Sequence, residues 1–438
     1  FSWRPPPMLP ESIPTQTSWQ PSQAARTADA KALAQHLRAS RARTLALLEV
    51  YEAALGPLLT VPCSPQLNPP LWEIGHIGWF QEFWLARNPQ RSLGVRADPQ
   101  APRAPSLLPQ ADALFNSSVV AHDSRWHLPL PSLQATRAYL QATLDQTLAL
   151  LAGEPDNDAA PYFYRLALFH EDMHGEAAVY MAQAMGVGLP PAMWGDGATR
   201  PSGPVQSLQL AAGDWTLGYK GSGFAFDNEL GPQSVQLGAY AIDDRPVSWR
   251  RYLPFAEAGG YADARWWSDA GWQWLQTGQG AAVLADPAGL CQAQSGPRYL
   301  RQINQDGCAP VWEQCLFGEW QTLDLDAPAC HLSYFEAEAW CRWAGRQLPT
   351  EAQWEQAAMT LPGFHWGEVW EWTASTFNPY PGFEAHPYRD YSAPWFGDRP
   401  VLRGASWATS KRMAHPRYRN YFTPERNDIH AGFRTCTG

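Results

Sequence analysis

The chain has 438 residues, of which 45% are hydrophobic and 17% are charged. This composition excludes a disordered chain, and the length exceeds what a single hydrophobic core usually organises, so we expect two domains. The net charge of −10, from 32 basic and 42 acidic residues, argues against a nucleic-acid partner, because binding phosphates requires clustered Lys and Arg.

The cysteines and the hydropathy pattern indicate the cellular compartment of the protein. Seven cysteines without a C-x-x-C pair predict neither a disulfide framework nor a zinc knuckle. No apolar run approaches the roughly 18 residues that a membrane-spanning helix requires, and the first ten residues lack the basic and apolar regions of a signal peptide. We therefore expect a cytoplasmic protein with reduced thiols and no membrane partner.

The first half of the chain has a helical pattern. Residues 1–27 are rich in Pro, Ser, Thr and Gln without periodicity, and predict a flexible tail or surface arm. Between residues 28 and 200, apolar residues recur every three or four positions at about 32–55, 69–88, 131–153 and 161–186. A Pro-rich connection near 97–110 separates the second pattern from the third. Four amphipathic helices with one long crossover predict a four-helix bundle.

The second half of the chain has a different character. A Pro- and Gly-rich stretch near 190–205 predicts a linker. Residues 201–438 contain short apolar runs, many Trp, Gly and Pro, and only a few helical patterns, such as SYFEAEAWCRWAG and TEAQWEQAAM. We expect an α+β domain with long loops, and an active site in the cleft between this domain and the bundle.

Two histidines lie four residues apart in the last helix of the bundle. His170 and His174 occupy the apolar stripe that also contains Phe163 and Met181, so both side chains point toward the bundle interior. His76 lies in a similar stripe of the helix at 69–88. Three neutral imidazoles that converge inside a bundle predict a metal site.

Other interpretations of these residues stay open. A buried histidine is often a hydrogen-bonded core residue, and the HEDMH pair lacks the downstream ligand of a zinc protease. Glu171, Asp172 and Glu176 fall off the apolar stripe, so we expect them to be solvated. His122 and His127, in the segment AHDSRWH, are candidates for a fourth ligand or for surface histidines.

A three-histidine site has a definite chemical consequence. It would leave half of the coordination sphere of an octahedral Fe(II) open, with no carboxylate to reduce the charge. Such a metal can accept a substrate nitrogen, a thiolate or selenolate, and dioxygen together.

Several motifs run through both halves of the chain: PPLWEIGHIGWFQEFW, FHEDMH, FAFDNELGPQSVQL, AIDDRPVSWRRYLPF, AGRQLPTEAQWEQAA, VWEWTAS and RGASWATSKRMAHPRYRNYFTPERNDIHAGFR. Together they resemble the motifs of the hercynine-dependent sulfoxide synthases of ergothioneine and ovothiol biosynthesis. The resemblance covers nearly all of the chain after the N-terminal tail. It implies a DinB-like four-helix bundle followed by a formylglycine-generating-enzyme-like, C-type-lectin-like α+β domain. It also implies an Fe(II) site at His76, His170 and His174.

The resemblance further implies a reaction and its residues. These enzymes use dioxygen to join a chalcogen to imidazole C2 of hercynine, which is trimethylated histidine. Tyr388 resembles a tyrosine that donates a proton near iron, and Tyr391 a tyrosine that helps to seat the substrate; alternatively, both rings simply pack. Asn420, Tyr421 and Phe422 resemble a pocket wall in which aromatic rings face a quaternary ammonium.

Departures from the family pattern bear on the donor. Formylglycine-generating enzymes carry two reactive cysteines after RGGS, and RGASWATSKRMAHPRYR has none, so that activity is not expected. Relatives that use thiols often have Gln before the last histidine ligand and, in one branch, Asp in the pocket wall. This chain has Met173 and Phe422 at those positions.

FNSSVVAHDSRWHLPLPSL together with FHEDMHGEA most resembles the selenoneine synthases, whose donor is a selenosugar. Ser117, Ser118, His122, Asp123 and Arg125 are then candidates for binding sugar hydroxyls, with surface turn chemistry as the alternative. Two further interpretations remain: an ergothioneine-type synthase that uses cysteine or glutamyl-cysteine, and a non-catalytic binding module of the same fold. Trp372 and Trp407 either line the cleft or pack in the core.

Overall fold

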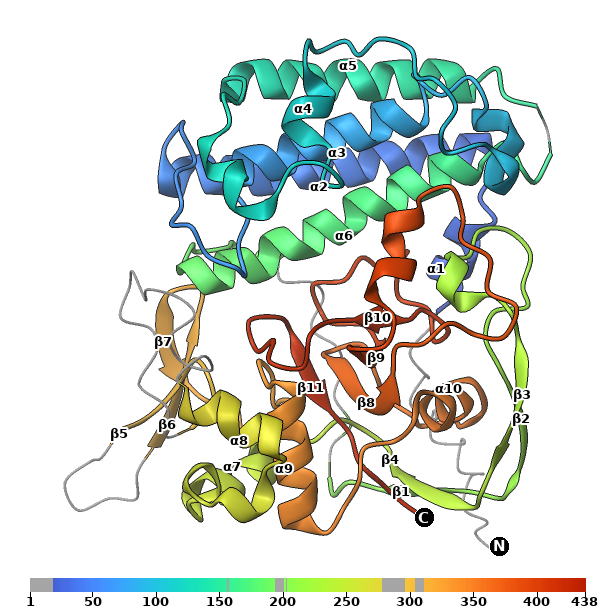
Figure 1. The fold of residues 1–438 in the computed structure, drawn as a ribbon. Coiled ribbons are helices and arrows are strands. Elements are labelled where there is room, and N and C mark those ends of the chain that lie inside the picture. Colours follow the sequence, from blue (N-terminus) through green and yellow to red (C-terminus); the bar gives the residue numbers. More distant parts are fainter. Residues whose placement is uncertain (1–18, 156, 194–200, 202, 278–295, 304–310) are drawn as a thin grey trace, which may run out of the picture.

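The computed structural model of the chain describes residues 19–155, 157–193, 201, 203–277, 296–303 and 311–438 (Figure 1). Its α-helices are α1 Gln20–Arg26, α2 Ala30–Leu55, α3 Pro70–Trp84, α4 Ala111–Phe115, α5 Leu133–Leu151, α6 Tyr162–Met185, α7 Trp249–Glu257, α8 Asp269–Gln276, α9 Tyr334–Ala344 and α10 Glu351–Thr360. The short 3-10 helices are η1 Arg91–Arg96, η2 His122–His127, η3 Pro191–Met193, η4 Asp227–Glu229, η5 Gly260–Ala262, η6 Ala264–Trp266, η7 Arg389–Tyr391 and η8 Ala393–Trp395.

The strands all belong to the second half of the chain. They are β1 Ser207–Leu210, β2 Gly213–Leu217, β3 Gln233–Leu237, β4 Tyr240–Asp243, β5 Leu300–Ile303, β6 Val311–Leu316, β7 Glu319–Thr322, β8 Trp370–Thr376, β9 Pro400–Gly404, β10 Asn420–Tyr421, β11 Ala431–Phe433 and β12 Cys436–Thr437. They form small sheets in the orders β1-β4-β12, β10-β9-β8-β11, β2-β3 and β5-β6-β7. Within the four-stranded sheet, only the pairing of β8 with β11 is parallel.

Helices α2, α3, α5 and α6 form the expected four-helix bundle (Figure 1). Two of them begin at side-chain caps: the Asp29 carboxylate accepts the backbone N–H of Ala32, and the Ser132 hydroxyl accepts that of Ala135. Helix α6 ends at Gly186, whose φ of 67° is the left-handed conformation that glycine adopts without a steric penalty. Local sequence signals therefore define these helix ends.

Helix α6 lies between the rest of the bundle and the second domain (Figure 1). Polar contacts join its outer face to the second domain: Arg412 donates to Asp172, and both Trp370 and Ser406 donate to Glu176. The expectation that Glu171, Asp172 and Glu176 are solvated is wrong. Glu171 binds Arg41 of α2 inside the bundle, and the second domain covers the other two.

The N-terminal segment also departs from expectation. Residues 1–18 lie outside the described part of the chain. Gln20–Arg26 is a helix rather than a flexible arm, and the Arg26 guanidinium, which is 2% exposed, forms a bidentate ion pair with Glu229 of the second domain. The composition of residues 1–27 cannot indicate this ion pair, because the partner carboxylate lies in the distant half of the chain.

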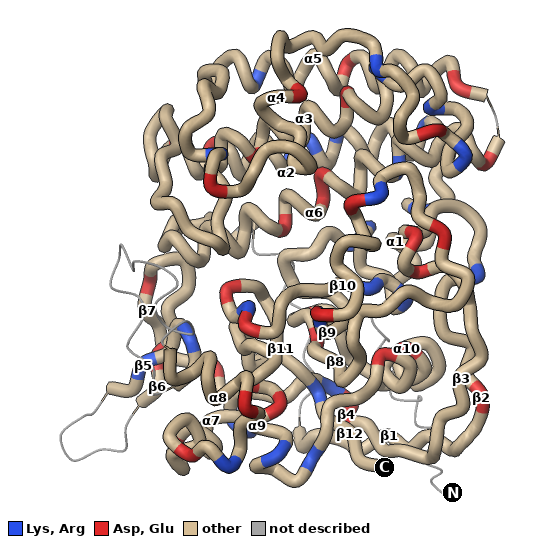
Figure 2. Tube along the Cα trace, in the orientation of Figure 1, with Lys and Arg blue, Asp and Glu red and all other residues tan. Residues whose placement is uncertain are grey.

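Charges are interspersed along both halves of the described trace (Figure 2). The long bundle helices carry many apolar residues, but none of the described helices combines the length and the low charge needed to cross a bilayer.

Candidate active site

Three histidine side chains meet where α3 crosses α6. The Nε2 atom of His170 lies 3.2 Å from Nε2 of His76 and 3.2 Å from Nε2 of His174. One nitrogen from each ring lies within 4.8 Å of the others, and no other such group of three was found among the described residues. Two ligands at right angles around a metal about 2.1 Å away would be separated by roughly 3 Å, so the spacing fits an ion bound by three nitrogens.

Hydrogen bonds on the far side of two rings fix their orientation. Nδ1 of His76 is 2.8 Å from the backbone carbonyl of Phe115, and Nδ1 of His174 is bonded to the Glu73 carboxylate. Each acceptor requires a proton on Nδ1, which leaves the Nε2 lone pair free to bind a metal. The partners thus select the tautomer that a metal site needs.

Glycine in α3 makes the Phe115 contact possible. A Cβ atom at Gly75 would lie 2.2 Å from the Phe115 ring, so any side chain would push α4 away from α3. Helix α4 ends at Phe115, and the last carbonyls of a helix have no partner within it. His76 and Trp72 use two of these carbonyls, those of Phe115 and Leu114.

Burial disfavours the charged forms of His76 and His170. Burial, together with nearby His174, lowers the pKa of His76 to about 3. Burial also holds the pKa of His170 well below its usual range. Burial opposes ionisation of Glu73, yet the electrostatic interaction with His174 and the hydrogen bond between them outweigh burial and lower the pKa of Glu73 to about 2. Neutral imidazole is the ligand form, and an ionised carboxylate is the better hydrogen-bond acceptor.

Aromatic rings enclose the histidine cluster. Phe80 stacks on His170 with ring centroids 3.6 Å apart, and Trp72 stacks on His76 at 4.9 Å. These contacts lock the rings and exclude water from the bundle side.

A loop between β8 and β9 brings two tyrosines to the cluster. The Tyr388 ring lies edge-on to His170, with centroids 6.4 Å apart, and to Phe80, at 4.9 Å. Tyr391 stacks on Phe226, and its hydroxyl lies 3.0 Å from that of Tyr418. Burial raises the pKa of Tyr388 and of Tyr391, so both phenols stay protonated at neutral pH.

Met173 connects this tyrosine cluster to the histidines. Its sulfur lies 3.9 Å from the Tyr391 hydroxyl and 3.6 Å from the Tyr418 hydroxyl, and the residue directly precedes His174. Tyr418 is not among the candidates that the sequence motifs indicate, although it lies two residues before Asn420 in the motif RYRNYF.

Comparison with known proteins identifies the family. Residues 36–182 match the DinB superfamily, and residues 197–365 and 363–437 match the sulfatase-modifying factor enzyme 1-like domain. A hercynine oxygenase from Mycobacterium tuberculosis is 32% identical over 92% of this chain and 97% of its own length. One from Mycolicibacterium thermoresistibile is 31% identical over 92% of this chain and 94% of its own length.

The chain belongs to the hercynine oxygenase family. Its fold class is the expected one, a DinB-like helical bundle followed by an α+β domain like that of the sulfatase-modifying factor. A formylglycine-generating enzyme from Streptomyces coelicolor is 26% identical over only 54% of this chain. The two hercynine oxygenases therefore cover 92% of this chain, whereas the formylglycine-generating enzyme matches about half of it.

The other residues singled out from the sequence lie at varying distances from the histidine cluster. Tyr421 stacks on Phe377 and donates to the backbone carbonyl of Tyr391, so it supports the tyrosine loop. The Asn420 side chain accepts the backbone N–H of Tyr421. Phe422 is half-buried and packs beneath the guanidinium of Arg426, 5.0 Å away.

The residues of the 117–125 segment are mostly engaged elsewhere. Ser118 is exposed and donates to Asp390 of the tyrosine loop, and Ser117 is half-buried beside it. Arg125 packs on Trp72, 3.9 Å from the ring centroid, and donates to Asn68. Both ring nitrogens of His122 have protein partners.

The remaining histidine and tryptophan candidates lie away from the centre. His127 is exposed at the end of η2, and neither His122 nor His127 belongs to the group of converging ligand atoms. Trp372 is fully buried and donates to the Leu332 carbonyl, while Trp407 packs against Phe317. Trp372 thus packs within the core, and the partly buried Trp407 packs against it.

Proposed function

We propose that this protein is an oxygen-dependent enzyme that forms a carbon–chalcogen bond at imidazole C2 of hercynine, with Fe(II) held by His76, His170 and His174. The observation that carries the proposal is the cluster of three imidazoles whose Nε2 atoms converge beside Tyr388. The donor set fits Fe(II), since imidazole is a good ligand for it. Among the described residues, no carboxylate joins the three histidines as a fourth ligand. Bound Fe(II) would supply binding and reduction of dioxygen.

The chain's own residues would position the substrate and handle protons. Hercynine carries an imidazole and a quaternary ammonium, which suits the aromatic surroundings of Tyr391, Tyr421 and Phe422, with Asn420 as a polar anchor. Tyr388 would donate a proton from its hydroxyl, because burial keeps the phenol neutral at physiological pH. The new bond replaces the C2–H bond of the imidazole and the Se–H or S–H bond of the donor, and dioxygen takes up the released electrons and protons.

We propose a selenosugar as the donor. The Met173 sulfur faces the hydroxyls of Tyr391 and Tyr418, so the position before the last histidine presents a soft thioether instead of an amide. A sugar has no carboxylate to clamp, which agrees with Phe422 in the pocket wall. Ser117, Ser118 and Arg125 lie on the segment that touches the tyrosine loop and are proposed to contact the sugar hydroxyls.

The alternative donors, cysteine and glutamyl-cysteine, are separated by a competition assay. Protein reconstituted with Fe(II) would receive hercynine, oxygen and equal amounts of a 1-selenosugar, a 1-thiosugar, cysteine and glutamyl-cysteine, and products would be identified by mass spectrometry. The selenosugar adduct should predominate. A predominant cysteine sulfoxide adduct would contradict the selenium assignment while leaving the hercynine chemistry intact.

The non-catalytic alternative is tested by metal analysis. Protein reconstituted without oxygen should bind one equivalent of Fe(II), and His76→Ala, His170→Ala and His174→Ala should each lose it. A binding module that packs three histidines as core would hold no iron. Tyr388→Phe removes one hydroxyl, so turnover should fall while hercynine affinity and iron content stay unchanged; an unaltered product yield would remove Tyr388 from the reaction.

A further inference from the structure

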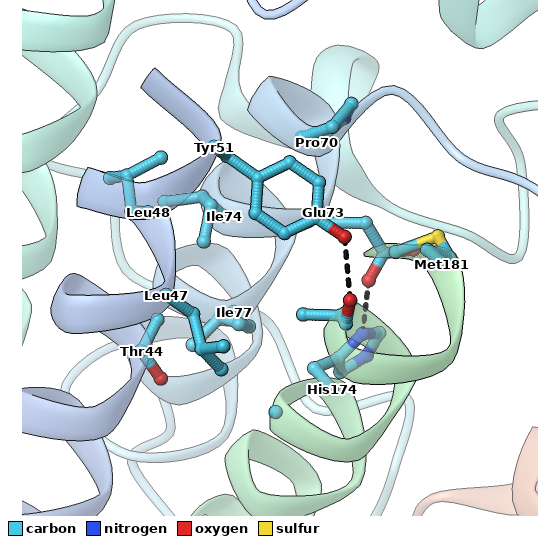
Figure 3. A pocket seen from close by; sticks show the side chains of 12 residues that line it. Thr44, Leu47, Leu48, Tyr51, Pro70, Glu73, Ile74, Ile77, His174 and Met181 are labelled. Carbon is cyan, nitrogen blue, oxygen red and sulfur yellow. Dashed lines mark hydrogen bonds and ion pairs between the residues drawn. The ribbon is translucent and has the colours of Figure 1, made fainter. Parts of the chain in front are cut away.

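A small cavity lies in the bundle core behind the histidine cluster (Figure 3). Its apolar wall consists of Leu47 and Leu48 from α2, Ile74 and Ile77 from α3, and Met181 from α6, each at most 8% exposed. Its volume of about 20 Å³ has room for one or two very small molecules. His174 and Glu73 also line it, so the cavity adjoins a proposed iron ligand.

The polar atoms at the cavity edge are already engaged. The Tyr51 hydroxyl donates to the Ala178 carbonyl at 2.5 Å, and the Thr44 hydroxyl donates to Glu171 at 2.8 Å. Glu73 binds His174 with one carboxylate oxygen and accepts from Asn68 with the other. A trapped water needs two to four polar partners, so this space favours an apolar occupant over water.

A glycine keeps the space open. Gly175 follows His174 in the middle of α6, is buried and lines the cavity, and a Cβ atom there would meet no atom within 4 Å. Glycine is unfavourable inside a helix, and its φ here does not require it. Gly75 and Gly78 differ, because their Cβ atoms would approach Phe115 and Tyr139 to 2.2 and 3.1 Å. Packing therefore explains the α3 glycines, whereas the effect of Gly175 is an unfilled volume.

We propose that this cavity is a binding site for dioxygen, from which the gas reaches the proposed iron centre on the bundle side. Dioxygen is an apolar diatomic of matching size, and apolar cavities of proteins bind comparable guests such as xenon. Tyr388 of the tyrosine loop packs against His170 and Phe80, neither of which lines the cavity. A separate apolar site would supply oxygen without crossing the substrate pocket. This inference rests on the proposed oxygen-dependent function.

Gly175→Ala tests the proposal by filling the cavity with one methyl group. Alanine favours the helix, so the variant should fold and retain one equivalent of Fe(II). Crystals of the full chain pressurised with xenon should show xenon against Leu48 and Ile77 in the wild type and none in Gly175→Ala. The apparent KM for oxygen should rise about threefold or more, while the KM for hercynine stays unchanged.

Two further variants make the test specific. Leu48→Phe fills the cavity from α2, leaves the three histidines unchanged in sequence and should reproduce the effect. Gly188→Ala is the matched control, because Gly188 is exposed, lies outside the cavity and has equal space for a Cβ atom, so both readouts should stay at wild-type values. No xenon in the wild-type cavity, or an unchanged KM for oxygen in both filled variants, would overturn the site.

These experiments distinguish a wrong proposed function from a wrong gas site. Xenon occupancy is measured without turnover, so a cavity that binds xenon in a protein that consumes no oxygen with hercynine would refute the function and, with it, dioxygen as the ligand. Conversely, oxygen consumption that is indifferent to Gly175→Ala and Leu48→Phe would leave the function intact and refute the gas site.

Discussion

Two ring nitrogens that face away from the histidine cluster determine how it presents its lone pairs. Phe115 offers a backbone carbonyl to His76, and Glu73 offers a carboxylate to His174. The carboxylate makes the imidazole a more basic ligand and restrains its rotation, whereas the carbonyl does so more weakly. At this scale the site depends on two acceptors that are not themselves ligands.

Glu73→Gln should weaken metal binding while leaving all three proposed ligands in place. The neutral amide is a poorer acceptor for His174, so we expect the Kd for Fe(II) to rise about tenfold or more. An anaerobic Fe(II) titration of the purified variant measures this. Glu52→Gln is the control, because Glu52 is 41% exposed and pairs only with Arg137. Equal affinities for both variants and the wild type would show that Glu73 is a packing residue.

At the scale of elements, one carboxylate closes the tyrosine loop. Asp227 of η4 accepts the backbone N–H of His386 at 3.2 Å with one oxygen and the Ser392 hydroxyl at 2.5 Å with the other. These two contacts flank Tyr388 and Tyr391. The bundle also holds the loop, because the Tyr162 hydroxyl of α6 forms a hydrogen bond with Nδ1 of His386. The loop is thereby held from both domains.

Asp227→Asn should loosen this loop without unfolding the protein. The amide nitrogen cannot accept a hydrogen bond, so one of the two contacts is lost, at a cost of about 1.5–3 kcal/mol for a bond to a charged group. We expect faster hydrogen exchange over residues 386–392 and lower turnover, with full Fe(II) content. Asp398→Asn changes a carboxylate on the same loop that is 72% exposed and should leave both unchanged. Unaltered exchange in Asp227→Asn would rule out the clamp.

His386 makes the same loop sensitive to acid. Burial lowers the pKa of His386 from 6.5 to about 4. Between these values the unfolded chain binds a proton that the native state does not, so stability should fall as pH decreases from 6.5 to about 4. The contribution of one such group to the slope is at most about 1.4 kcal/mol per pH unit. Denaturant unfolding at pH 7 and pH 4.5 should show a smaller acid loss in His386→Asn than in the wild type; equal losses would contradict the assignment.

At the scale of the whole molecule, buried ion pairs join the two halves of the chain. Arg26 and Glu229 are 2% and 0% exposed, and Arg412 reaches Asp172 across the interface. Removing one partner of a buried pair leaves an uncompensated charge. Because the candidate active site takes its histidines from the bundle and its tyrosines from the second domain, the joint between domains bears on both stability and activity.

Arg26→Ala should destabilise the protein strongly, by about 3–5 kcal/mol, because Glu229 would remain buried without its partner. Denaturant midpoints at pH 7 measure this. Arg250→Ala is the matched control: Arg250 and Asp326 form an equally bidentate pair, but both are exposed, at 59% and 72%, so the midpoint should not move. If Arg26→Ala unfolded at the wild-type midpoint, the N-terminal helix would not be part of the cooperative fold.

The features that the local sequence predicts correctly rest on the periodic spacing of side chains along a helix. Three imidazoles are predicted on inward faces, from the spacing of four between His170 and His174 and from the aromatic stripe around His76. The recurrence of apolar residues every three or four positions predicts the four bundle helices. The family motifs predicted the second domain. These inferences succeed because helix geometry alone decides which side chains share a face.

Only the tertiary structure decided what those faces meet. Glu73 and the Phe115 carbonyl became partners of the histidines because α4 packs closely on α3 at Gly75, and Tyr418 met Met173 across the domain interface. Asp172 and Glu176 are predicted to be solvated from the helix pattern, but the second domain packs on α6 and covers both. Each of these contacts joins residues far apart in the chain, and periodicity carries no information about which distant element will lie opposite a given helix face.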